Sequence, residues 1–427
     1  MEPLARSLTL PCGAILSNRI AKAAMTEGLA DPDDRASEGL ATLYGRWSDG
    51  GAGLLLTGNV MVDRRYLERP GNVVIDGNGG EAGLRTWAAA GTRSGNHLWM
   101  QISHPGRQCT RMSSSHPVSP SSEKLQGMMG LIAPPRALGV DEIHEIIERF
   151  AEVARTAKDN GFTGVQIHSA HGYLSSQFLS PRANKRTDEW GGSLENRARF
   201  LLETYAAVRA TVGSDFPIAV KLNSADFQKG GFSKEESARV AGWLAERGLD
   251  LLEISGGTYE QMALLGRGDA SDEAKAESTR QREAYFLEYA RDIRKSAEGL
   301  PLMVTGGFRT PQLMRDVLDS GEVDLIGIAR PFCVAPDFPR ELLAGGLEAL
   351  PMPEKEIRLG PGIFGRASSS RSMRTLNSQA EVAWFYRQII EMSEGREPDP
   401  RFGTWSCLFG HFAGEFRRAR RRTFAEG

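Results

Sequence analysis

Two histidines and a tyrosine lie close together in the chain, as His168, His171 and Tyr173. They directly follow Gly164–Ile167, a short and mainly apolar stretch that predicts a buried strand. The three side chains are therefore expected just past the carboxyl end of a strand, the edge where open α/β sheets and α/β barrels bind ligands. Each can donate a hydrogen bond, so together they could hold one small polar ligand.

The spacing of the two histidines leaves three uses open. The pair could be half of a zinc site, although no Glu lies between His168 and His171 and no third ligand is evident. The pair could also be purely structural. We favour a third use, in which both imidazoles polarise a carbonyl-like oxygen, and we predict no metal site. Tyr173 has an ordinary pKa of about 10, so it is protonated at neutral pH and could donate a proton.

Polar residues also mark other predicted strands. Thr26 follows the first strand, Gln101 lies in the third, and Lys221 lies in the fifth. Lys221 by itself leaves two interpretations open, because a lysine in a barrel could form a Schiff base or could present a cation to an electron-rich cofactor.

The last two predicted strands end in a pattern that favours phosphate. Gly306-Gly307 closes the seventh strand, and Ala329-Arg330 closes the eighth. A Gly-Gly pair alone predicts only a tight turn. With a backbone donor and an arginine at the end of the next strand, it matches the phosphate site common in α/β barrels, so we predict phosphate binding here.

A scaffold must bring these strand ends together. The predicted strands are Ile20–Met25, Gly53–Asn59, His97–Ser103, Gly164–His168, Ile218–Asn223, Leu251–Ser255, Leu302–Gly306 and Leu325–Ala329. The predicted helices include Glu142–Asn160, Leu194–Val212, Lys234–Arg247, Gln281–Glu298 and Pro311–Ser320. This repeated alternation predicts an α/β fold, a closed (β/α)₈ TIM barrel, with an open doubly wound sheet as the alternative.

Three segments depart from the alternation. Leu8–Arg19 predicts a small hairpin that forms an N-terminal lid over the barrel floor, with its turn at Pro11-Cys12-Gly13. The long segment His104–Val140 and the polar segment Gly266–Gln281 follow strand ends. Long loops within a compact domain are usually functional or disordered, so we expect both to be substrate loops.

We place the barrel at residues 1–350 and a C-terminal extension at residues 351–427. The extension is rich in aromatic residues and carries an arginine-rich end, Arg417–Arg422. We expect a packing arm with a solvated basic end, and the alternative is an arm that bridges subunits and helps to shape the active site. The aromatic residues favour self-association, so we expect a homo-oligomer.

The composition excludes several other classes of protein. The formal net charge of −2 over 427 residues gives no general attraction to nucleic acid or to acidic membranes. The first residues lack a signal peptide, and no apolar run approaches the roughly 20 residues of a membrane helix. The four cysteines are widely spaced, which disfavours a disulfide framework. We therefore expect a soluble cytoplasmic protein that acts on a small molecule.

Longer motifs resemble the old yellow enzyme family of FMN-dependent oxidoreductases. They lie in order between Leu4 and Leu347, and several long motifs in order are more specific than any one of them. The motifs are Asn18–Ile20 leading into Ala24–Thr26, Gln101–Arg107, His168–Pro181 with Arg186–Arg197, and Thr305–Phe308.

The resemblance implies an FMN-bearing barrel. Lys221 would lie beside the N1/O2 edge of the flavin, where a cation stabilises the reduced ring. The residues expected to touch the flavin ring at the barrel mouth are Ala23, Ala24, Met25, Thr26, Gly58 and Gln101. Those expected to hold the phosphate are Gly306, Gly307, Ala329 and Arg330.

The same resemblance implies an ene-reductase. NADH or NADPH would reduce FMN and leave, and an α,β-unsaturated carbonyl compound would then enter the same site in a ping-pong cycle. His168 and His171 would bind its carbonyl oxygen, and Tyr173 would donate the proton. The alternatives are an FMN dehydrogenase or biosynthetic isomerase with a specialised substrate, and a flavin-free Schiff-base aldolase using Lys221.

The chain departs from this family pattern in three ways. Relatives usually have Pro where Ala24 stands and Arg where Lys221 stands. A lysine presents a point charge rather than a planar fork, so we expect a different flavin potential. The dienoyl-CoA reductase branch carries a four-cysteine iron–sulfur cluster just beyond the barrel, which Cys333 and Cys407 cannot supply.

Overall fold

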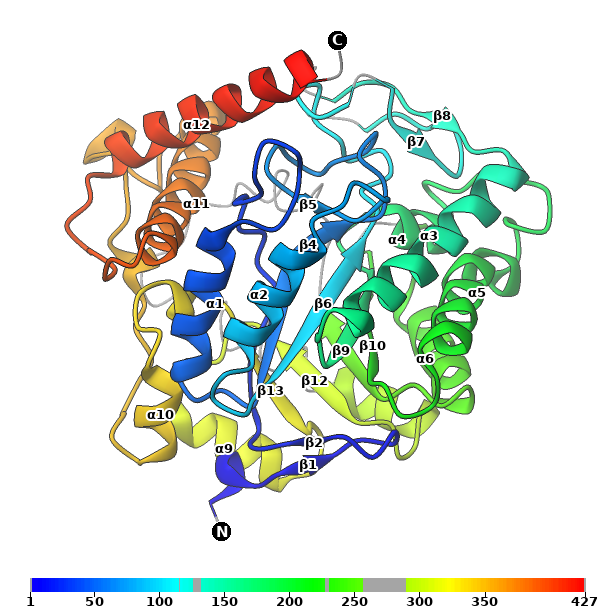
Figure 1. Cartoon of the computed structure of the whole chain (residues 1–427), viewed down its shortest axis with the longest axis horizontal. Helices are drawn as coiled ribbons and strands as arrows, with labels where there is room; N and C mark the ends of the chain where they lie inside the picture. Colours follow the sequence, from blue (N-terminus) through cyan, green and yellow to red (C-terminus); the bar gives the residue numbers. More distant parts are fainter. Residues whose placement is uncertain (1, 115, 126–131, 227–229, 256–288, 426–427) are drawn as a thin grey trace.

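Eight parallel strands close into a barrel at the centre of the molecule (Figure 1). Neighbouring strands follow the order β3, β13, β12, β11, β10, β9, β6 and β4, and β4 pairs again with β3. The predicted (β/α)₈ barrel is therefore confirmed, and the open sheet is wrong because β3 is bonded on both sides. The computed structural model describes residues 2–114, 116–125, 132–226, 230–255 and 289–425.

The barrel strands lie close to their predicted positions. Their bounds are β3 (Ile20–Lys22), β4 (Leu54–Met61), β6 (His97–Ser103), β9 (Gly164–Ser169), β10 (Ile218–Asn223), β11 (Leu251–Ser255), β12 (Leu302–Thr305) and β13 (Leu325–Ile328). The clearest difference is β3, which ends three residues before the predicted Met25. The Ala23 amide makes one last bond, to the carbonyl of Ile328 at 2.8 Å, and the chain then leaves the ladder.

Helices surround the barrel and cover its outer face (Figure 1). They are α1 (Glu38–Asp49), α2 (Glu81–Gly91), α3 (Val140–Asp159), α4 (Leu174–Leu179), α5 (Leu194–Val212), α6 (Lys234–Glu246), α9 (Pro311–Asp319) and α10 (Phe338–Leu343). Local signals set their ends. The Ser193 hydroxyl accepts the Asn196 amide at the start of α5, and Gly213 follows the helix with a φ of 83°. Of the predicted helix Gln281–Glu298, residues 289–296 are described and helical.

Side chains inside the barrel form layers, because successive strand residues point to opposite faces. The lowest layer is apolar and buried, and it contains Leu54, Trp99, Ala219, Leu251, Met303 and Leu325. Above it, β6, β9, β10 and β11 contribute a polar layer that is also buried, and it contains Gln101, Gln166, Lys221 and Glu253. The barrel interior therefore changes from apolar to polar toward the carboxyl ends of the strands.

The N-terminal hairpin closes the lower end of the barrel, as predicted. Its strands are β1 (Leu8–Thr9) and β2 (Ile15–Leu16), paired antiparallel. The Gly13 amide donates to the Leu10 carbonyl at 2.8 Å, which places the turn where the sequence predicts it. Apolar side chains of the hairpin pack on the lowest barrel layer. In Figure 1 the hairpin lies at the bottom, opposite the short strands β7 (Val118–Ser119) and β8 (Arg136–Ala137).

Those two short strands belong to the predicted loop His104–Val140, and they pair with each other beyond the upper end of β6. The other predicted loop, Gly266–Gln281, lies outside the described residues. Two long helices, α11 (Arg371–Ser393) and α12 (Thr404–Ala425), form most of the C-terminal extension. Among the described helices, none combines the length and the apolar character needed to cross a membrane.

The extension packs on the barrel along one side. Helix α11 lies against α1, and α12 lies against α11. Near the upper end, the buried Arg69 guanidinium bonds the Glu415 carboxylate of α12 at 2.7 Å and lies 4.0 Å from the ring centre of Tyr386 in α11. The extension thus contacts the loop that follows β4.

Candidate active site at the barrel mouth

His168 and His171 meet at the carboxyl end of β9. Their ring centres are 5.1 Å apart, with the planes nearly perpendicular. His171 lies beyond the strand in a left-handed conformation, with a φ of 59°. Its backbone amide donates to the Asn223 side chain at 3.0 Å, and its Nε2 lies 2.7 Å from the Ser255 hydroxyl. Groups at the ends of β10 and β11 therefore fix the second histidine against the first.

Tyr173 joins this pair from the start of α4. Its ring centre is 4.8 Å from that of His168, and the side chain is 2% exposed. The phenol is buried because the chain turns from β9 directly into α4, and Gln177 bonds back to the Pro105 and Gly172 carbonyls. The structure brings the three residues together as the sequence predicted.

Burial keeps both imidazoles neutral. Burial lowers the pKa of His168 well below its usual range, helped by the nearby His171 and Lys221. Burial and the charge of Lys221 lower the pKa of His171 to about 3. A neutral imidazole has one N–H donor and one acceptor nitrogen. The His168 Nδ1 accepts the Ala170 amide at 3.2 Å, which leaves the proton on Nε2.

Below the histidines, four buried side chains form a continuous polar chain. Gln101 donates to Gln166 at 2.6 Å, and Gln166 donates to one oxygen of Glu253 at 2.8 Å. The other oxygen of Glu253 lies 2.8 Å from the Lys221 ammonium. Sequence reasoning found Gln101 and Lys221 and missed the two residues between them. Both are polar positions at every second residue within apolar runs, so inward alternation could have revealed them.

The segment after β3 borders the mouth on another side. Ala23 is buried, whereas Ala24, Met25 and Thr26 are partly exposed. The Thr26 hydroxyl donates to Glu68 at 2.8 Å. Gly58, which was predicted to touch the flavin, lies directly against this segment. A Cβ added to Gly58 would be 2.5 Å from the Met25 carbonyl oxygen. Only glycine allows β4 and this segment to approach one another in this way.

A second buried charge cluster holds this segment from outside the barrel. Lys22 donates to the Leu56 carbonyl at 2.6 Å and to the Tyr44 hydroxyl at 3.3 Å. The Tyr44 hydroxyl also bonds Glu27, which accepts the Gly58 amide at 2.8 Å. Burial lowers the pKa of Lys22 to about 8 and raises the pKa of Glu27. Sequence reasoning missed this cluster, because nothing in so short a strand marks its lysine as buried.

The predicted phosphate residues lie at the ends of β12 and β13. Gly306 and Gly307 have φ angles of 126° and 78°, which L side chains rarely adopt. Ala329 precedes the short turn η2 (Arg330–Cys333). The Arg330 guanidinium points toward the extension, 3.0 Å from Glu381 and 5.7 Å from the ring centre of Phe385. Arg330 therefore contacts α11, an interaction that the sequence did not predict.

The residues present fit a flavin mononucleotide. The buried hydroxyls of Ser103 and Thr305, on β6 and β12, have no hydrogen-bond partner among the described residues. A Cβ built on Gly306 would meet nothing within 4 Å, so open space borders this glycine. With Lys221 and Gln101 below the mouth, these groups could bond the ring edge and leave room for the phosphate. Within the described part of the chain, no cluster of His, Cys, Asp and Glu is arranged to bind a metal.

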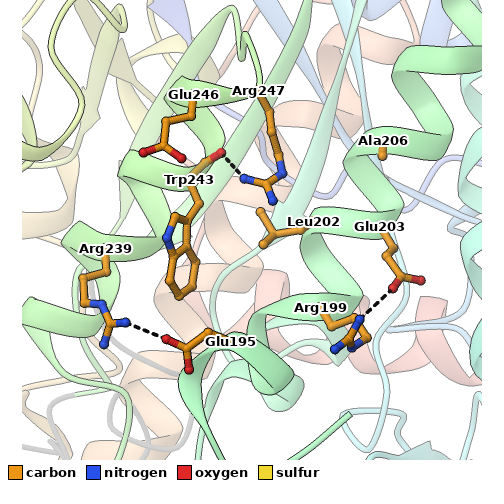
Figure 2. Close-up of a pocket in the computed structure, with 9 residues that line it drawn as sticks. All are labelled: Glu195, Arg199, Leu202, Glu203, Ala206, Arg239, Trp243, Glu246 and Arg247. Carbon is orange, nitrogen blue, oxygen red and sulfur yellow. Dashed lines mark hydrogen bonds and ion pairs between the residues drawn. The ribbon is translucent and has the colours of Figure 1, made fainter. Parts of the chain in front are cut away.

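A separate hollow of about 730 Å³ lies outside the barrel, between α5 and α6 (Figure 2). Its polar lining includes ion pairs of Arg239 with Glu195 at 2.6 Å and of Arg199 with Glu203 at 3.5 Å. Trp243 forms its apolar part. None of the predicted site residues line it, so we do not assign the chemistry to this hollow.

Known proteins resemble this chain in sequence. Residues 12–347 match the family described as NADH:flavin oxidoreductase / NADH oxidase. An NADH-dependent flavin oxidoreductase of Hypocrea jecorina is 36% identical over 357 residues, covering 79% of this chain and 88% of that protein. A namesake from a Neonectria species is 34% identical over 403 residues, covering 90% of this chain and 51% of that protein. This chain thus spans about half the length of the Neonectria relative.

Solved structures agree with the sequence matches. An old yellow enzyme homologue from Zymomonas mobilis superposes with a TM-score of 0.68 at 26% identity, covering 82% of this chain and 95% of that one. Morphinone reductase superposes with a TM-score of 0.66 at 26% identity, covering 83% and 92%. The match in sequence and in shape spans the whole barrel. This chain therefore belongs to the NADH:flavin oxidoreductase / NADH oxidase family, the old yellow enzyme group of FMN-dependent NADH oxidoreductases.

Proposed function

We propose that this protein reduces the C=C bond of an α,β-unsaturated carbonyl compound, with NADH or NADPH as the hydride source. The observation that supports this most strongly is the cluster of His168, His171 and Tyr173, which places two neutral imidazoles and a phenol at one end of the barrel. When bound, FMN supplies the redox step, because it accepts a hydride from the nicotinamide and passes one to carbon. Nicotinamide and substrate use the same site in turn, in a ping-pong cycle.

The histidines would bind the carbonyl oxygen of the substrate. Hydride addition to the β-carbon builds negative charge on that oxygen, and fixed N–H donors lower the energy of this state. The Ala170 amide orients His168, and Ser255 orients His171, so neither ring has to reorganise during the reaction. Their lowered pKa values keep them neutral, so they would act as donors and not as acids.

Tyr173 would complete the reduction. The C=C bond gains one hydride and one proton, and the phenol is a donor held 4.8 Å, ring centre to ring centre, from His168. Its proton would pass to the α-carbon while the histidines hold the oxygen.

The arrangement of Lys221 favours this reading over a Schiff-base aldolase. An amine must be unprotonated to attack a carbonyl. The Lys221 nitrogen lies 2.8 Å from the buried Glu253 carboxylate, and it would have to leave this partner before it could attack a carbonyl. Its place in the polar layer suits a cation below a flavin.

Tyr173→Phe tests the proposal. In anaerobic stopped-flow experiments, we expect flavin reduction by NADH to stay within about threefold of the parent, and reoxidation by a small enone to slow at least about a hundredfold. Tyr205→Phe is a matched control, because Tyr205 is equally buried but bonds the Arg247 carbonyl in the outer helical layer. An equal loss in both half-reactions of Tyr173→Phe would contradict the assignment.

We also propose that residues 351–427 form an arm that supports the mouth and joins two subunits. The support comes from Arg69 with Glu415 and from Arg330 with Glu381. The joining surface would be an exposed apolar stripe on α12, formed by Trp405, Phe409, Phe412 and Phe416. Sedimentation should show a dimer that dissociates when Phe409 and Phe416 are changed to Ser. A monomeric parent would refute the joining role.

A further inference from the structure

We infer that Glu253 sets the electrostatic field at the flavin by compensating the charge of Lys221, so that the pair, and not the lysine alone, determines the reduction potential. The inference rests on the proposed function, because it assumes that FMN lies above Lys221. Glu253 would be a positioning residue, since it acts on the flavin through the lysine and is not itself expected to touch the substrate.

The geometry holds Glu253 by both oxygens. Lys221 and Glu253 are direct partners in the β10–β11 ladder, so their side chains enter the barrel side by side. The ammonium lies 2.8 Å from one oxygen, and the side chains are 4% and 0% exposed. The other oxygen accepts Gln166 at 2.8 Å, and Gln166 in turn accepts Gln101. The carboxylate therefore cannot swing away from the lysine without breaking this chain.

The surroundings give the pair its influence. The apolar layer of Trp99, Ala219 and Leu251 lies underneath, so little water can screen the two charges from below. Above them, the histidines are neutral. Two other buried charges, Lys22 and Glu27, also offset one another. An unpaired ammonium here would strongly favour the negative charge of a reduced flavin, whereas a paired one presents mainly a dipole.

Two single variants test opposite halves of the pair. Glu253→Gln keeps the size of the side chain and leaves Lys221 uncompensated, so we expect reduced FMN to bind at least about tenfold more tightly relative to oxidised FMN. For a two-electron couple, that is a rise of about 30 mV in the midpoint potential. Lys221→Met should shift the potential in the opposite direction. Both potentials are measured by equilibration with reference dyes, independently of turnover.

The double variant Lys221→Met with Glu253→Gln keeps the test decisive if a single variant fails to fold, because it buries no unpaired charge. We expect its potential to lie closer to the parent than to Lys221→Met. Asp250→Asn is the matched control. Asp250 is also a buried carboxylate with a cationic partner, Arg209, but it lies just before β11 at the opposite end of the barrel. It should lower the melting temperature without moving the potential.

The outcomes separate the two proposals. Flavin-loaded Glu253→Gln with the potential of the parent would overturn the inference and leave the proposed function standing. A double variant whose potential falls as far as that of Lys221→Met would overturn it too, because the lysine would then act alone. A parent chain that binds no FMN, by fluorescence titration of the free cofactor, would overturn both.

Discussion

The lower and upper halves of the barrel interior are built from the same strands and yet differ in character. At the lower end, six apolar side chains fill the interior, and the hairpin packs beneath them. At the upper end, β6, β9, β10 and β11 present amides, charges and an imidazole, including Gln166, Lys221 and His168. In β6, β10 and β11 the change takes place within two residues, from Trp99, Ala219 and Leu251 to Gln101, Lys221 and Glu253. One set of strands therefore supplies both the packed core and the reactive surface.

The buried polar groups at the two ends of the barrel also serve different purposes. At the lower end, Asp250 pairs with Arg209 and accepts the amides of Ile218 and Cys12, which joins α5, β10 and the hairpin. All of these bonds hold segments of the chain together. At the upper end, the hydroxyls of Ser103 and Thr305 lack partners in the described structure. Satisfied polar groups indicate stability, and unsatisfied ones indicate a place for a ligand.

The largest effect is expected at the upper end. Changing both His168 and His171 to Ala should slow reoxidation by an enone about 10⁴-fold, because two fixed donors to the developing oxyanion are lost. Stopped-flow spectroscopy of the pre-reduced enzyme measures this rate. His97→Ala is the control, since His97 contacts the Ile15 carbonyl at the lower end. If His97→Ala slowed the reaction as much, the division between the two ends would fail.

The next effect is on stability and belongs to the lower end. Leu251→Ala removes a fully buried side chain from the apolar layer and should cost about 3 kcal/mol in the free energy of unfolding. Urea titration with and without FMN measures this cost. The midpoint potential of the bound flavin should stay unchanged. A large shift in potential would show that the two layers are coupled.

A smaller effect is expected from pH. The native histidines at the mouth stay neutral, because burial lowers the pKa of His168 and lowers that of His171 to about 3. Below about pH 6.5 the unfolded chain binds protons that the native chain does not. The free energy of unfolding therefore decreases as the pH is lowered. Each such histidine contributes up to about 1.4 kcal/mol per pH unit.

Replacing His171 with Gln should therefore flatten the dependence of stability on pH between pH 6 and pH 4. Urea unfolding at several pH values measures the slope. Between pH 7 and pH 8 the variant and the parent should have parallel curves. A variant that keeps the full acid dependence of the parent would show that His171 is charged in the native protein.

The smallest effect is expected outside the barrel. Arg239→Ala removes an exposed ion pair with Glu195 in the hollow between α5 and α6 (Figure 2). Exposed pairs contribute little, so both half-reactions should change by less than about twofold. Stopped-flow traces of this variant and the parent should superimpose. A loss of activity would give the hollow a role that its lining does not suggest.

Much of this architecture could be predicted from the pattern of side chains. β6, β10 and β11 have their predicted bounds, because runs of buried residues between turn signals define strands well. β3 was predicted too long, because Ala23–Met25 are as apolar as the strand that precedes them. No residue within this segment indicates where the neighbouring strand ceases to provide backbone hydrogen-bond partners.

The site was only partly predictable for a related reason. The cluster of His168, His171 and Tyr173 is local in sequence, so its spacing was enough to find it. Glu253 looks like a solvent-facing residue until β10 is placed beside it. Arg330 was predicted to hold phosphate, and its pairing with Glu381 depends on an extension that begins after the barrel has closed.

The sequence by itself determined the order of strands and helices, the reactive cluster and the family, because these depend on residue type and on spacing along one segment. Only the tertiary structure decided which polar side chains share the barrel interior. Pairing β6, β9, β10 and β11 side by side brings residues more than a hundred positions apart into one layer, where Gln101, Gln166, Lys221 and Glu253 become a single chain. Contacts of this kind depend on register across the barrel, which no single segment encodes.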